Sequence, residues 1–131
     1  MERLPVKFRA MTRLSGLAMC VLAGFVSACS TLGDDLRRAD ELYRQARYES
    51  AEAWTRALQM ERRAMTPSER LRFEYLRGMC AYRLGRHEEA LHSLLLAQVL
   101  VADHPDGLQG QDKALLARIV AERVGAANAV R

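Results

Sequence analysis

The sequence predicts an all-α fold. Beyond residue 33, apolar residues recur at intervals of three and four, which is the spacing of one face of an α-helix. Helix-start and helix-stop signals bound these stretches, and no stretch alternates apolar and polar residues as a half-buried strand does. Half of the 131 residues are hydrophobic, so the chain has the composition and length of one globular domain.

The first three expected helices lie between residues 34 and 84. Asp34 and Asp35 open the first, because carboxylates are favourable at a helix N-terminus. The second follows Tyr48 and continues to about residue 64. The third starts at Thr66-Pro67-Ser68-Glu69, where threonine can cap, proline suits the first turn and glutamate completes a capping box.

Two further helices follow Gly85, which breaks the third. The fourth is expected over about residues 87–101, and a turn-rich loop covers residues 103–107. The fifth is expected over about residues 111–124, with the domain spanning residues 34–126 and residues 127–131 forming a flexible tail.

Residues 1–28 have the layout of a secretory signal peptide. Basic residues come first, an apolar run from Leu17 to Val26 follows, and small residues end the segment. The run is about ten residues long, whereas a membrane-spanning helix needs about 20. Translation starting at Met11 is an alternative to Met1, because the later segment is a complete signal by itself.

Val26-Ser27-Ala28-Cys29 resembles the lipobox of bacterial lipoproteins. The resemblance implies cleavage between Ala28 and Cys29, with diacylglycerol and an N-acyl lipid on Cys29 and residues 29–33 as a lipidated tether. Several acyl chains make a durable membrane anchor. Ser30 stands where aspartate would signal inner-membrane retention, so the resemblance implies an outer-membrane protein facing the periplasm. The alternative is a plain secretory peptide with an incidental cysteine.

Cysteine and charge counts change once the signal peptide is removed. Of the three cysteines, Cys20 is lost and Cys29 is lipidated, so Cys80 remains without an intramolecular partner. A buried thiol is expected there, with a reactive thiol or an intermolecular disulfide as the alternative. The net charge falls from +4 to about +1, because four of the basic residues and one acid lie in residues 1–28. A nucleic-acid partner is therefore not expected.

Two segments of the chain align with each other. Residues 46–51 (ARYESA) match residues 85–90 (GRHEEA), and each segment separates two expected helices. A repeated helix–turn–helix unit predicts a stacked helical array.

The second unit, Leu71 to Ala102, resembles a tetratricopeptide repeat (TPR). The matching residues are Gly78, Tyr82, Gly85, Ala90, Leu94 and Ala97. The first unit, Leu32 to Met60, is a weaker match through Tyr43, Ala46, Tyr48, Ala51 and Leu58. The resemblance implies two TPR-like hairpins with the fifth helix as a C-terminal cap. The repeat period of 39 residues exceeds the family's about 34, so a generic pair of helical hairpins is the alternative.

The TPR resemblance also implies a groove that binds a protein partner. On the third helix its expected lining is Arg72, Tyr75, Leu76, Met79, Tyr82 and Arg83, and the first helix adds Tyr43 and Arg44. These are residue types enriched at interfaces. The alternative is that Leu76 and Met79 are partly covered by the first hairpin and that the arginines are merely solvated.

The stretch GRHEEALH, residues 85–92, comes nearest to a catalytic motif. Zinc-protease histidines are four residues apart, but His87 and His92 are five apart, which separates the rings by roughly 140° around a helix. No phosphate-binding loop or nucleophile motif is found elsewhere. We therefore expect no catalytic residue, no metal, no cofactor beyond the lipid on Cys29 and no small-molecule substrate.

These expectations combine into one functional prediction. The chain is expected to be a lipid-anchored periplasmic adaptor that binds a protein partner and assists an envelope complex such as a secretion system or pilus. The alternative is a structural envelope lipoprotein that contacts peptidoglycan or other envelope proteins.

Overall fold

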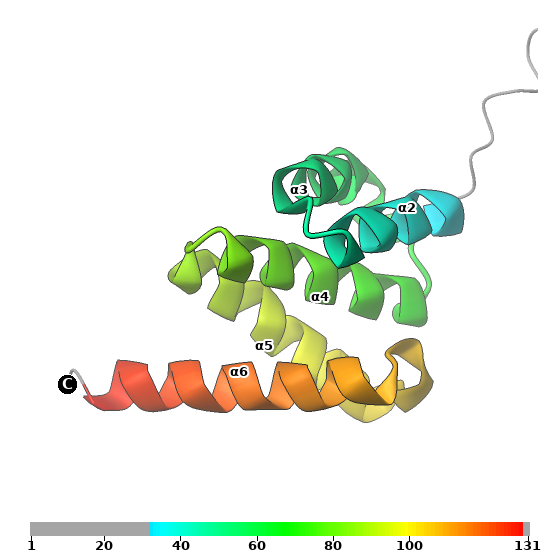
Figure 1. Ribbon diagram of the computed structural model, residues 1–131. Coiled ribbons are helices and arrows are strands. Elements are labelled where there is room, and N and C mark those ends of the chain that lie inside the picture. The colour runs from blue at the N-terminus through cyan, green and yellow to red at the C-terminus, as the bar shows by residue number, and fades with distance from the viewer. Residues whose placement is uncertain (1–31, 130–131) are drawn as a thin grey trace, which may run out of the picture. The chain divides into compact units, whose positions relative to one another are not determined.

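The computed structural model describes residues 32–129, and all of their regular structure is helical (Figure 1). The all-α prediction is confirmed. The elements are α2 (Leu32–Arg44), α3 (Tyr48–Ala57), the 3₁₀ segment η2 (Leu58–Ala64), α4 (Pro67–Arg83), α5 (His87–Asp103), the 3₁₀ turn η3 (Pro105–Gly107) and α6 (Gly110–Ala129). The predicted signal peptide, its cleavage site at Ala28 and the lipidation site Cys29 lie outside the described residues.

The helix boundaries differ from the prediction at both ends of the domain. The α2 helix begins at Leu32, so the last two residues of the predicted tether are helical. Leu32 packs against a buried cluster of Leu36, Leu58, Met65 and Phe73, which extends the helix backwards. At the other end, α6 continues to Ala129, and residues 127–129 are not a separate tail. Alanine has the highest helix propensity, so these residues prolong the helix.

The second predicted helix is α-helical only to Ala57, and its last seven residues form η2. Leu58 at the start of η2 and Met65 just after it are both buried. Between them, the Arg62 guanidinium pairs with the buried Glu74 carboxylate of α4 at 2.6 Å. These contacts fasten the segment to α4 in the tighter helical form.

The predicted start of α4 is confirmed in detail. The Thr66 side-chain oxygen accepts a hydrogen bond from the Glu69 backbone N–H at 3.3 Å. The Glu69 carboxylate in turn accepts from the Thr66 backbone N–H at 2.8 Å. This reciprocal pair satisfies two N–H groups that a helix start otherwise leaves without partners.

The two hairpin turns have the same hydrogen bonds. Arg47 N–H donates to the Leu42 carbonyl at 2.9 Å, and Arg86 N–H donates to the Ala81 carbonyl at 2.9 Å, which is the pattern of a Schellman cap. The residue before each arginine has a positive φ, 58° at Ala46 and 80° at Gly85. The sequence match between the two segments is thus also a structural match.

The α4 helix lies at the centre of the domain, with α2 and α3 above it in Figure 1 and α6 below it. Its most extensive contact is with α5. Gly78 makes this close packing possible, because a Cβ atom there would lie 2.7 Å from the Leu94 side chain. The largest buried cluster contains residues of α2, α4, α5 and α6.

Candidate partner-binding surface

The middle of the predicted groove is buried. Tyr75 is 2% exposed, and Leu76 and Met79 are 0% exposed. All three belong to the core cluster that also contains Ala39 of α2 and Ile119 of α6. The prediction that they line an open groove is therefore wrong, since neighbouring helices cover this part of α4.

The Tyr75 hydroxyl shows how this part of α4 is closed. It donates a hydrogen bond to the Asp112 carboxylate of α6 at 3.1 Å. Burial and the neighbouring Asp112 charge both raise the pKa of Tyr75, so the phenol stays neutral and keeps its proton for this bond. Tyr75 therefore fastens α6 to α4 and is not a contact for a partner.

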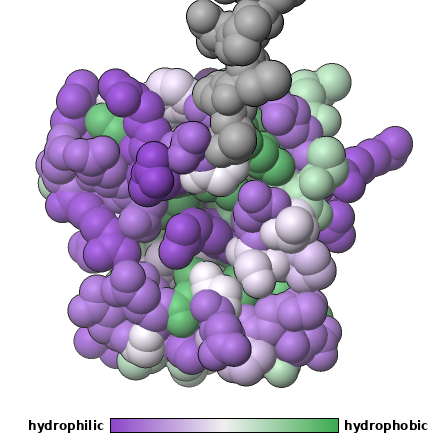
Figure 2. Space-filling view, turned by 90° about the vertical axis from the view of Figure 1, so that its right-hand side faces the viewer, coloured by the Kyte–Doolittle hydropathy of each residue, from purple (hydrophilic) through white to green (hydrophobic). Residues whose placement is uncertain are grey.

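Arg72 lies apart from the other predicted groove residues. It lines a small hollow of about 180 Å³ together with Leu36, Ser68, Glu69, Asp106 and two glycines. The hollow is at the end of the domain where α2 and α4 begin, which is the end that faces the viewer in Figure 2. That end is mostly hydrophilic, and hydrophobic residues show mainly between the polar ones.

The remaining predicted residues lie near the hairpin turns, where aromatic rings are paired. In the first hairpin, Tyr43 at the end of α2 and Tyr48 at the start of α3 have ring centroids 5.5 Å apart. In the second, Tyr82 and His87 occupy the equivalent positions with centroids 5.4 Å apart. Tilted aromatic pairs at such distances are favourable, so both turns are held by the same ring contact.

An arginine from the helix that follows each hairpin also contacts the ring pair of that hairpin. The Arg83 guanidinium carbon of α4 lies 5.9 Å from the Tyr48 ring centroid, and its Nε donates to the Tyr43 hydroxyl at 3.5 Å. The Arg123 guanidinium carbon of α6 lies 5.3 Å from the Tyr82 ring centroid. We call this set the aromatic–arginine surface: Tyr43, Tyr48, Tyr82, Arg83, His87 and Arg123.

The contact between Tyr43 and Arg83 keeps the Arg83 side chain charged. Burial raises the pKa of the Tyr43 phenol, although Arg83 opposes that shift. The hydrogen bond to Tyr43 raises the pKa of Arg83. At neutral pH the neutral Tyr43 phenol therefore lies beside a charged Arg83 guanidinium. Flat rings and guanidinium groups together suit a peptide that brings carboxylates or aromatic side chains.

Arg44, the remaining predicted groove residue, forms ion pairs within the domain. Its guanidinium pairs with Asp40 at 2.8 Å and reaches Asp112 of α6 at 3.8 Å. The hydrogen bond to Asp40 raises the pKa of Arg44. Arg44 is exposed, but its charge is already used to link α2 with α6 near the Tyr75–Asp112 bond.

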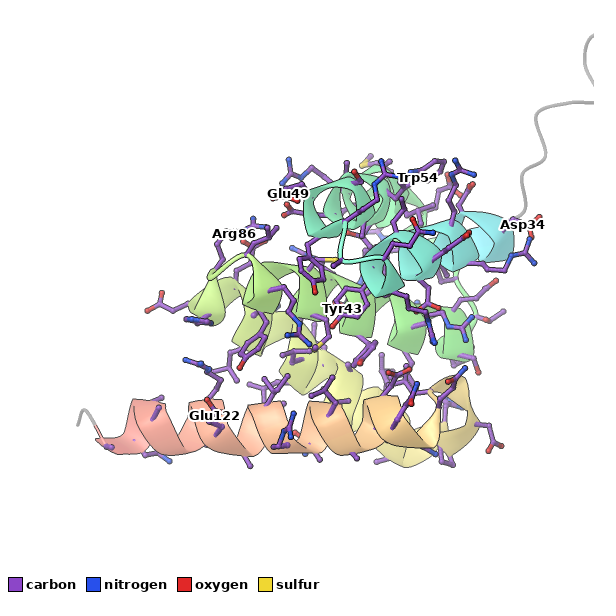
Figure 3. The ribbon with its side chains drawn as sticks, in the orientation of Figure 1. Asp34, Tyr43, Glu49, Trp54, Arg86 and Glu122 are labelled. Carbon is purple, nitrogen blue, oxygen red and sulfur yellow. The ribbon has the colours of Figure 1, made fainter. Side chains whose placement is uncertain are left out.

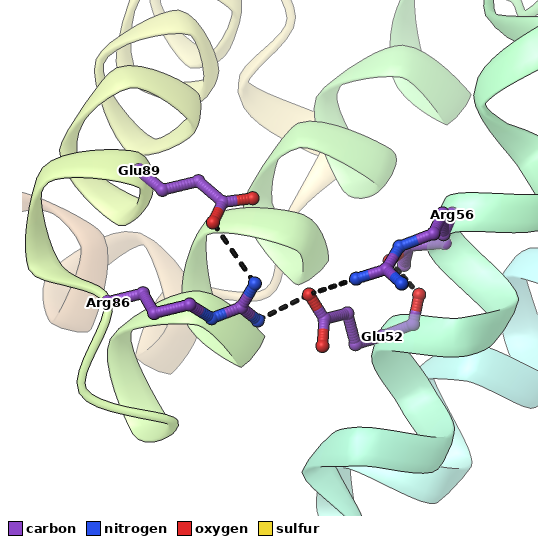
Figure 4. A network of polar contacts seen from close by, with 5 residues as sticks. Glu52, Arg56, Arg86 and Glu89 are labelled. Carbon is purple, nitrogen blue, oxygen red and sulfur yellow. Dashed lines mark hydrogen bonds and ion pairs between the residues drawn. The ribbon is translucent and has the colours of Figure 1, made fainter.

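A second polar network joins the two hairpins (Figure 4). Glu52 of α3 pairs with Arg86, which precedes α5, and also with Arg56 at 3.1 Å. Arg86 pairs in addition with Glu89 at 3.1 Å. Sequence reasoning missed this network, although the arginine recurs in both repeated segments as Arg47 and Arg86.

Cys80 lies beneath this network and is fully buried. Burial raises the pKa of its thiol to about 12, with the Glu52 charge adding to the shift. The thiol is therefore protonated at neutral pH and does not supply the thiolate that nucleophilic chemistry requires.

Within residues 32–129, no three His, Cys, Asp or Glu side chains gather as metal ligands would. The His87 ring faces Tyr82, and His92 is exposed one turn further along α5. No helix in the described part of the chain is long and apolar enough to cross a membrane.

Comparison with protein-family models, with curated proteins and with solved structures finds no match to this chain.

Proposed function

We propose that this chain is a lipid-anchored adaptor of the bacterial outer membrane that faces the periplasm. The observation that carries the proposal is Val26-Ser27-Ala28-Cys29, which lies at the end of an apolar run that a basic stretch precedes. Only Ser30 and Thr31 separate Cys29 from the first described helix. An anchored Cys29 would therefore hold the helical domain within about 10 Å of the bilayer surface.

The adaptor role is supported by the aromatic–arginine surface on a TPR-like pair of hairpins. We expect this surface to bind a protein partner within an envelope complex such as a secretion system or pilus. Its tyrosines and arginines are the residue types that dominate binding energy at protein interfaces. The buried residues Tyr75, Leu76 and Met79 take no direct part.

The anchor is tested by replacing Cys29 with serine. The parent chain should incorporate labelled palmitate and fractionate with outer membranes, whereas Cys29→Ser should lose the label and appear in the soluble fraction. Cys80→Ala is the matched control and should keep both properties. A Cys29→Ser protein that still carries label and stays with membranes would overturn the anchor.

Partner binding is tested by crosslinking in intact cells and identification of proteins recovered with the chain. Tyr82→Ala combined with Arg83→Ala should abolish the specific crosslink, because both side chains belong to the aromatic–arginine surface. Arg72→Ala, at the other end of α4, is the control and should leave the crosslink unchanged.

Equal recovery from the double variant and the control would contradict the proposed surface. Co-sedimentation of the parent chain with purified peptidoglycan, without a specific protein crosslink, would favour a structural envelope protein instead.

A further inference from the structure

The α6 helix repeats the core pattern of α4 forty residues later. Leu76, Met79 and Cys80 of α4 correspond to Leu116, Ile119 and Val120 of α6, and all six are buried. Arg83 corresponds in the same way to Arg123, and each places its guanidinium over a tyrosine of the preceding hairpin. By this correspondence α6 is placed in the domain as the first helix of each hairpin is.

The face of α4 that packs against α5 has an uncovered counterpart on α6. On α4 this face includes Gly78 and Ala81, which are both buried, and Gly78 lies directly against Leu94 of α5. The corresponding residues of α6 are Arg118 and Ala121, and both are exposed. In the described part of the chain no helix takes the place that α5 takes on α4.

The composition of this face is unlike that of a terminal capping helix. The last element of a stacked array needs a polar outer face, but α6 exposes mainly apolar and small residues. Those on the side away from the buried residues are Ala114, Ala117, Ala121, Val124 and Gly125. The face is therefore suited to contact another helix.

The charges beside this face are self-complementary. Arg118 and Glu122 are both exposed and lie one helical turn apart on the same edge of the face. Arg118 has no ion pair within the described part of the chain, and the Glu122 carboxylate has only its sequence neighbour Arg123 at 3.4 Å. Glu122, labelled in Figure 3, projects from the C-terminal half of α6.

We propose that α6 pairs with the α6 helix of a second copy of this chain. The two helices run antiparallel about a twofold axis near residue 120, which brings Arg118 of each copy beside Glu122 of the other. Ala114, Ala117, Ala121 and Val124 then pack between the helices. The pairing is isologous and closed, as in most homodimers.

The opposite end of the domain argues against open-ended stacking. A head-to-tail array would place α6 of one copy on α2 of the next. The exposed residues of α2 include Asp34, Arg37, Arg38 and Glu41, so that contact would desolvate charges against an apolar face. The α6–α6 contact instead matches apolar surface with apolar surface.

The association is tested by sedimentation equilibrium of the full chain in density-matched detergent. The parent chain should show twice the protein mass of one chain. Arg118→Glu and Glu122→Arg each place like charges opposite one another, so each single variant should lose the dimer or weaken it at least tenfold. The double variant restores opposite charges and should recover the dimer.

A crosslink locates the contact. Ala121→Cys lies beside the proposed axis and should form a disulfide-linked dimer under mild oxidation, beyond any background from the parent cysteines. Ala53→Cys, exposed on α3, is the matched control and should not. A parent chain of single-chain mass, or a double variant that stays monomeric, would overturn the proposal, as would equal crosslinking at the two positions.

Discussion

Ala46 adopts a backbone conformation that glycine adopts at the equivalent position of the second hairpin. Its φ is 58°, and it is the non-glycine residue with a positive φ among residues 32–129. A side chain in this left-handed region costs roughly 1–2 kcal/mol. The first hairpin therefore carries a strain that Gly85 removes from the second.

Exchanging these two residues should change stability in opposite directions. We expect Ala46→Gly to raise the free energy of unfolding by about 0.5–1 kcal/mol, since the relieved strain exceeds the added chain entropy of glycine. Gly85→Ala should lower it by about 1 kcal/mol, and a Cβ at position 85 meets no atom within 4 Å, so backbone strain is its sole cause. Urea denaturation measures both, and a lower midpoint for Ala46→Gly would contradict the interpretation.

The buried thiol of Cys80 predicts loss of stability at alkaline pH. Burial raises its pKa from 9.0 to about 12, so the folded chain keeps this proton after the unfolded chain has lost it. The stabilisation is complete below pH 9 and is lost as pH rises towards 12. The Tyr43 and Tyr75 phenols, whose pKa values are raised from 10.0, add to the loss at higher pH.

Urea denaturation between pH 9 and pH 10, compared between the parent and Cys80→Ala, measures the contribution of Cys80 ionisation to stability. In this range the free energy of unfolding should fall with pH in both proteins. We expect the slope for the parent to exceed the slope for Cys80→Ala by about 1 kcal/mol per pH unit. The comparison uses slopes, because removing the side chain also lowers stability at every pH. Parallel slopes for the two proteins would show that Cys80 ionises alike in both states.

The contact between α4 and α5 depends on a position that has no side chain. We expect Gly78→Ala to destabilise the chain by about 1–3 kcal/mol, because the new methyl group would overlap Leu94 at 2.7 Å and press on its backbone nitrogen at 3.1 Å. The same substitution at Gly125 should stabilise α6 by up to about 1 kcal/mol, since nothing lies within 4 Å there.

Thermal unfolding of Gly78→Ala and Gly125→Ala measures both effects. Opposite shifts in melting temperature are expected. Shifts of the same sign would show that helix propensity, and not the approach of α5, decides the outcome at Gly78.

Features with local causes were predictable from the sequence. The Thr66–Glu69 cap was predicted because both partners lie within four residues of each other. The turns at Ala46 and Gly85 were found because the same segment occurs twice. By contrast, the burial of Tyr75 depends on Asp112 of α6, and no spacing along α4 indicates which helix will cover it.

The aromatic–arginine surface was predicted only in part for the same reason. Tyr43, Tyr82 and Arg83 were identified because they lie on the first helices of the two repeats. Arg123 was missed because its contact with Tyr82 joins residues 41 positions apart, and nothing in the residues beside it marks that contact. The helices follow from local spacing, but the site follows from how they stack.

The contacts between the two hairpins predict that residues 32–129 unfold as one cooperative unit. Arg83 of the second hairpin lies on Tyr43 and Tyr48 of the first, and Arg86 pairs with Glu52 across the same junction. The largest core cluster also takes residues from both hairpins and from α6. Opening either hairpin alone would expose this shared core.

The single tryptophan makes this cooperativity measurable. Trp54 lies on α3, with the Arg38 guanidinium carbon 5.6 Å from its ring, so its fluorescence reports on the first hairpin. Far-ultraviolet circular dichroism reports on all helices. The two urea transitions should coincide, and Gly78→Ala in the second hairpin should shift both equally. A fluorescence transition that this substitution leaves in place would show that the hairpins unfold separately, and the interface formed by Arg83 and Arg86 would then be too weak to couple them.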